Sequence, residues 1–64
     1  MEKAKENDVV QIIEGDWIGV LVHVTELYNW GIQGFVYVPN KGQAFIRIKH
    51  EDYVVIGESY FKIS

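Results

Sequence analysis

The 64-residue sequence contains no cysteine, which excludes disulfide bonds and thiolate metal sites. No apolar run approaches the roughly 18 residues that a membrane-spanning helix needs. The charged first residues also lack the apolar stretch of a secretory signal peptide. We therefore expect a cytoplasmic protein that does not associate with membranes.

Positive charge is scarce, because six Lys and Arg residues stand against nine Asp and Glu residues, a formal net charge of -3. A net negative charge opposes long-range attraction to a polyanion such as RNA or DNA. The charge balance favours a protein partner, and only a local basic patch would keep nucleic-acid binding open.

Apolar residues are abundant for so short a chain, at 48% of the sequence against 23% charged residues. This balance is typical of a folded domain rather than of a disordered segment. A chain of this length forms one small domain, so most of its apolar residues must contribute to a single core.

Apolar and polar residues alternate with a period of two through most of the chain, and β-branched and aromatic residues are frequent. No segment has the sustained 3.6-residue apolar repeat of an amphipathic helix. Strands are expected at residues 8–13, 20–26, 33–38, 43–49 and 54–56, with a short or irregular sixth strand in 58–63. One 3-10 turn is expected at residues 50–53.

Five to six short strands with regularly spaced turn signals predict an all-β fold, and a small antiparallel barrel is favoured because closure removes exposed strand edges. The barrel is expected to span residues 8–57. A flexible polar N-terminal tail is expected over residues 1–7, and an extra strand or tail over residues 58–64.

Three glycines mark the predicted structural turns. Gly15 and Gly19 bracket a loop in which a side chain would meet the neighbouring strand or require a positive φ. Gly42 closes a tight turn over residues 39–42 (PNKG), which proline initiates.

The stretch 10–24 (VQIIEGDWIGVLVHV) resembles the KOW motif of SH3-like barrels in large-subunit ribosomal proteins and in the C-terminal domain of NusG-type transcription elongation factors. The motif positions are filled by Gly15, Gly19, Trp17 and Val24. The resemblance covers roughly residues 9–56 and implies a small SH3-like barrel that binds RNA, DNA or ribonucleoprotein. Two departures are Val22, where such motifs usually carry a further glycine, and the lack of basic charge.

Aromatic side chains on the third and fourth expected strands form the candidate partner-binding surface. If the valines and isoleucines of these strands point inward, the residues that point outward are Phe35, Tyr37, Phe45, Arg47 and Lys49. A large exposed aromatic patch on a small domain indicates an interface. The alternatives are that the C-terminal segment covers the patch, or that a second copy does so in a homodimer.

The two tryptophans lie in expected loops, Trp17 after the first strand and Trp30 after the second. Each either packs on the barrel as a structural cover or is an exposed anchor, since tryptophan concentrates binding energy at interfaces. The predicted partner-binding residues are therefore Trp17, Trp30, Phe35, Tyr37, Phe45, Arg47 and Lys49.

The sequence contains no motif for catalysis. It lacks a phosphate-binding glycine loop and a nucleophile elbow, and His50 lies in an acidic turn that is expected to face solvent. We therefore predict no enzymatic activity, no catalytic residue, no metal site and no cofactor.

The expected function is that of a non-catalytic binding module, which docks a protein partner through exposed aromatic residues. One alternative is KOW-like binding of RNA, DNA or ribonucleoprotein. Another is an acidic accessory or inhibitor protein, for example of phage origin, that masks a nucleic-acid-binding surface. Its phosphate mimics would be Glu14, Asp16, Glu51 and Asp52.

Overall fold

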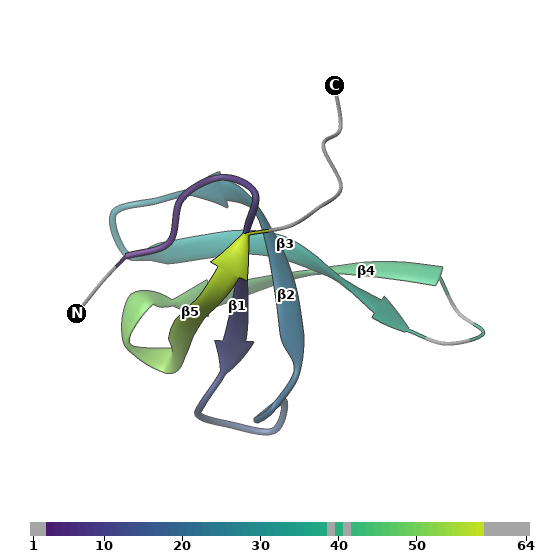
Figure 1. The fold of residues 1–64 in the computed structure, drawn as a ribbon. Coiled ribbons are helices and arrows are strands. Elements are labelled where there is room, and N and C mark those ends of the chain that lie inside the picture. Colours follow the sequence, from purple (N-terminus) through teal and green to yellow (C-terminus); the bar gives the residue numbers. More distant parts are fainter. Residues whose placement is uncertain (1–2, 39, 41, 59–64) are drawn as a thin grey trace.

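The computed structural model describes residues 3–38, 40 and 42–58. In chain order, its elements are β1 (Asp8–Ile12), β2 (Leu21–Leu27), β3 (Gly31–Val38), β4 (Gly42–Lys49), the 3-10 helix η1 (His50–Asp52) and β5 (Tyr53–Glu58). The strands form one antiparallel sheet (Figure 1). The all-β class expected from the sequence, with antiparallel strands and one 3-10 turn, is confirmed.

The strand order is β4-β3-β2-β1-β5, so the last strand returns to pair with the first. In Figure 1, β3 and β4 run across the direction of β1, β2 and β5. η1 connects β4 to β5, and no ladder joins these two strands within the residues that the structure describes. Among the described residues, β4 and β5 are therefore the edge strands of the sheet.

The core lies on the inner face of the bent sheet. Its buried residues are Ala4, Val10, Ile12, Val22, Val24, Ile32, Val36, Ile48 and Tyr53. Of the β3 and β4 residues that the period-two pattern allows to point inward, Val36 and Ile48 are buried and Ile46 is half-buried, whereas Ala44 is exposed. Ala44 lies on the edge strand β4. The β3–β4 hairpin extends away from the other strands (Figure 1).

Gly34 on β3 permits a close approach to β2. A Cβ at this position would collide with the carbonyl oxygen of His23 and would lie 2.7 Å from Cγ1 of Val22. The register of β2 and β3 also shifts between Val24 and Glu26, as in a β-bulge. Bulges and strand glycines accompany strong local twist and bending, which here fold the sheet around its core.

The backbone conformation explains why glycine occupies the three turn positions. Gly15 and Gly19 adopt φ 90°, Gly42 adopts φ 83°, and a Cβ at each would meet nothing within 4 Å. Positive φ, rather than lack of space, therefore favours glycine at all three positions. In the β1–β2 loop, the Ile18 N–H donates to the Gly15 carbonyl at 3.3 Å, which closes the turn that carries Trp17.

The N-terminal segment packs against the sheet at Ala4, although the sequence indicated a polar tail. Ala4 is only 5% exposed, and its N–H donates to the Tyr53 hydroxyl at 3.1 Å. The Lys5 N–H donates to the Asp8 carboxylate at 2.7 Å, and the Asp8 N–H donates to the Lys5 carbonyl at 3.1 Å. These bonds form a turn that places the one small apolar residue of the segment in the core.

β5 is longer than the pattern indicated, since it pairs with β1 from Tyr53 to Glu58. The expected sixth strand lies outside the described residues, apart from Glu58 at the end of β5. Within the described part of the chain, no helix is long and apolar enough to cross a membrane.

Candidate partner-binding surface

An aromatic ladder crosses the outer face of the sheet. The register places Phe35 opposite both His23 and Phe45. The rings of His23 and Phe35 stack with centroids 4.7 Å apart, and Phe45 meets Phe35 edge-on at 6.3 Å. Phe35 is half-buried between them, whereas Phe45 on the edge strand is 66% exposed. The ladder therefore ends in an open ring at the edge of the sheet.

The basic residues of β4 continue this face. The Arg47 Nε–H donates to Oε1 of Gln33 at 3.0 Å, which fixes the guanidinium beside Phe45. Gln33, Phe45, Ile46 and Arg47 line a shallow hollow of about 360 Å³. Lys49 is also exposed on the same face.

A second hollow, of about 250 Å³, lies between β4 and the β1–β2 loop, and its lining includes Trp17 and residues 46–49. Successive residues of a strand point to opposite faces, so a hollow lined by four consecutive residues runs along the strand edge. Trp17 is 53% exposed and leaves much of its indole open. The fold thus places Trp17 across from Arg47 and Lys49, which are far from it in sequence.

Trp30 lies apart from this group, in the β2–β3 connection. Its indole stacks on Tyr28 at 5.1 Å with an interplanar angle of 7°, and it is 49% exposed. The Tyr28 hydroxyl donates to the Glu26 carboxylate. Trp30 therefore both braces the turn and presents a ring to solvent.

The environment of Tyr28 gives a pH prediction. The hydrogen bond to Glu26, with smaller effects of burial and of the Glu26 charge, raises the Tyr28 pKa above 10.0, and Arg47 opposes the rise. The linked stability is present below pH 10 and is lost as pH rises through the higher folded-state pKa. In Glu26→Ala we expect Tyr28 to titrate at lower pH, measured as tyrosinate absorbance against Tyr28→Phe. Glu51→Ala is the control, and it should leave the Tyr28 titration as in the wild-type chain. A Tyr28 titration in Glu26→Ala identical to that of the wild-type chain would contradict the prediction.

The predicted site residues thus divide into three sets. Trp17, Phe35, Phe45, Arg47 and Lys49 lie around β4 or on the adjoining outer face. Trp30 lies at the β2–β3 turn. The Tyr37 side chain is outside the described part of the structure.

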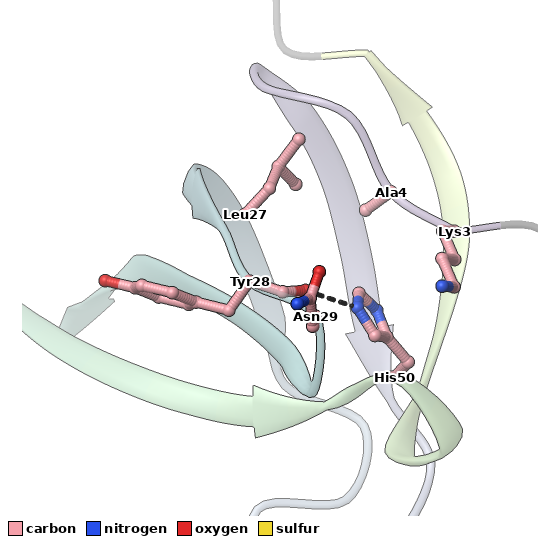
Figure 2. A pocket seen from close by; sticks show the side chains of 6 residues that line it. All are labelled: Lys3, Ala4, Leu27, Tyr28, Asn29 and His50. Carbon is pink, nitrogen blue, oxygen red and sulfur yellow. Dashed lines mark hydrogen bonds between the residues drawn. The ribbon is translucent and has the colours of Figure 1, made fainter.

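A third hollow, of about 500 Å³, opens between the N-terminal segment and the β2–β3 turn (Figure 2). Its lining residues are Lys3, Ala4, Leu27, Tyr28, Asn29 and His50. His50 is the histidine in this set, and both of its ring nitrogens are engaged. Nε2 lies 2.8 Å from the Tyr28 carbonyl oxygen, and Nδ1 lies 2.6 Å from the Tyr53 hydroxyl.

The partners of His50 assign its protons. A carbonyl oxygen only accepts, so Nε2 carries a proton toward Tyr28. In the neutral ring, Nδ1 then accepts from the Tyr53 hydroxyl, whose oxygen accepts from the Ala4 N–H. His50 therefore has a structural role. The sequence analysis expected its turn to face solvent and did not predict this role. Its only sequence signal is the His50–Tyr53 spacing within one turn.

Among the described residues, no group of three His, Cys, Asp or Glu side chains is placed to hold a metal ion. No family model, curated protein or solved structure matches the chain.

Proposed function

We propose that the protein is a non-catalytic binding module that docks a protein partner through a surface around β4. This docking surface consists of Trp17, Phe45, Arg47 and Lys49, with Phe35 supporting Phe45. One observation carries the proposal: two large rings from separate elements, Phe45 on β4 and Trp17 in the hollow beside residues 46–49, are 66% and 53% exposed. Exposed aromatic residues of this size are typical anchors at interfaces.

The docking surface is also preorganised. Phe45 rests edge-on against Phe35, and Arg47 is held by Gln33, so fewer side-chain rotations are lost on binding. Arg47 and Lys49 favour an acidic patch on the partner. Glu14 and Asp16 line the Trp17 side of the hollow and would repel a phosphate backbone, which favours protein over nucleic acid.

The proposal is tested by truncating the anchors. Phe45→Ala and Trp17→Ala should each weaken the binding of a captured protein partner by about 2 kcal/mol, roughly 30-fold in Kd. The thermal unfolding curve of each variant should change little. Partners are identified by mass spectrometry after affinity capture, and their Kd values are measured with the purified proteins. Ile56→Ala is the matched control, because Ile56 is 51% exposed on β5, at the other edge of the sheet. Equal affinity for both anchor variants and the control would refute the docking surface.

A second candidate function is KOW-like binding of single-stranded nucleic acid, because an exposed ring beside a guanidinium suits base stacking with a backbone contact. Titration of labelled single-stranded RNA, single-stranded DNA and duplex DNA at two salt concentrations distinguishes the two functions. Nucleic-acid binding must weaken as salt rises, whereas absence of binding at low salt removes this candidate. An inhibitor of nucleic-acid binding would instead compete with DNA for the captured partner.

A further inference from the structure

β4 has an open edge. Within the described residues it pairs only with β3, and no other backbone hydrogen bond joins Gly42–Lys49 to a different segment. Such an edge presents a row of N–H and C=O groups, and the group that satisfies such a row along its length is another strand. The chemistry of the edge therefore specifies a β-strand as its partner.

The two halves of β4 differ in their surroundings. Residues 46–49 form one wall of the hollow beside Trp17, whereas residues 42–45 are all exposed and lie where the hairpin extends outward (Figure 1). One half is therefore the wall of a groove, and the other is a projecting strand of the same length. A two-fold axis near the middle of the strand would place the projecting half of each copy in the groove of the other. The edge is thus self-complementary, as an isologous interface requires.

We propose that two copies of this chain pair antiparallel along β4, with the two-fold axis at Ile46, to form one continuous sheet. A continuous sheet with matching faces requires the axis to pass at a residue, because facing residues must point to the same side. The two halves meet between Phe45 and Ile46, so these two residues are the candidates for the axis.

The charged side chains favour Ile46 over Phe45 as the residue at the two-fold axis. With the axis there, Arg47 faces Phe45 of the second copy, a cation–π pair, and Lys49 faces the uncharged Gln43. An axis at Phe45 would leave Lys49 beyond the end of the facing strand, and an axis at Arg47 would oppose two guanidinium groups.

The inner face gains cover in the same register. Ile46, which is half-buried in one copy, faces Ile46 of the other, and the exposed Ala44 faces Ile48. Pairing along the strand edge leaves the outer face of Phe35 and Phe45 open to a partner, whereas the second copy fills the groove beside Trp17. The dimer is inferred from the open edge of β4 and does not rest on the proposed docking function.

The absence of cysteine allows a direct test of the register. Facing residues in an antiparallel pair have Cα atoms about 4.5–5.5 Å apart, within disulfide range. Ile46→Cys should therefore oxidise to a covalent dimer of doubled mass. Phe45→Cys and Arg47→Cys should each remain unlinked alone, but should link to each other in an equimolar mixture. Sedimentation equilibrium of the wild-type chain should show a monomer–dimer equilibrium.

Two results would overturn the pairing. One is a wild-type chain that stays monomeric at millimolar concentration, and the other is self-linking of Phe45→Cys in preference to Ile46→Cys. If Ile46→Cys loses stability, the mixture of Phe45→Cys and Arg47→Cys still tests the register, because Phe45 and Arg47 are both exposed. Failure to capture a different protein would leave all of these readouts unchanged, so the dimer and the docking function fail separately.

Discussion

Gly34→Ala is expected to remove a large part of the protein's free energy of unfolding. The added Cβ would collide with the carbonyl oxygen of His23 and crowd the Val22 side chain, which is 0% exposed. The backbone of a paired strand cannot move aside as a flexible side chain does. We therefore expect the free energy of unfolding to fall by about 3 kcal/mol. Domains of this size have roughly 3–10 kcal/mol of stability in total. Far-UV circular dichroism during urea titration measures the change.

Gly57→Ala is the matched control for this substitution. Gly57 also lies in a strand, but a Cβ there would meet nothing within 4 Å and its φ is not positive. Its free energy of unfolding should change by less than about 0.5 kcal/mol. Equal stability of the two variants would show that β2 and β3 do not approach as closely at Gly34 as the structure has them.

Tyr53→Phe is expected to lower the free energy of unfolding by about 1–3 kcal/mol, although it keeps the ring and removes only an oxygen. Tyr53 is 2% exposed, and its hydroxyl joins the Ala4 N–H to His50 Nδ1. Without that oxygen, the Ala4 N–H loses its partner in a buried place, and His50 Nδ1 loses its partner in a partly buried one. Urea unfolding measures the loss, and faster hydrogen exchange of the Ala4 amide should accompany it.

Tyr28→Phe removes a hydroxyl of the same kind from a more open position, where its partner is the exposed Glu26 carboxylate. The free energy of unfolding of Tyr28→Phe should therefore change far less than that of Tyr53→Phe. If Tyr28→Phe cost as much as Tyr53→Phe, the buried network around His50 would not be a specific stabilising feature.

Local patterns were sufficient to predict the strands. Alternation along β2 placed Val22 and Val24 on the same face of the strand, and both are 0% exposed. A short turn after the fourth strand was expected from sequence, and η1 occupies it. These features depend on neighbours in the sequence, where a period of two and turn chemistry operate.

Long-range packing was not predictable in the same way. The Ala4–Tyr53 bond joins residues 49 positions apart, and no periodicity in a polar segment indicates it. The site shows the same division, because alternation placed Phe45 and Arg47 on one face. The position of Trp17 across the β4 edge depends instead on how the β1–β2 loop folds against a distant strand.

The return of β5 to β1 affects how this chain folds during synthesis. β1 lies between β2 and β5, so a nascent chain that has not yet produced residues 53–58 leaves β1 without one of its two partners. Contacts between such distant segments form late and slowly. Folding should therefore wait until the last strand has left the ribosome, and a chain that stops before it would expose a strand edge prone to aggregation.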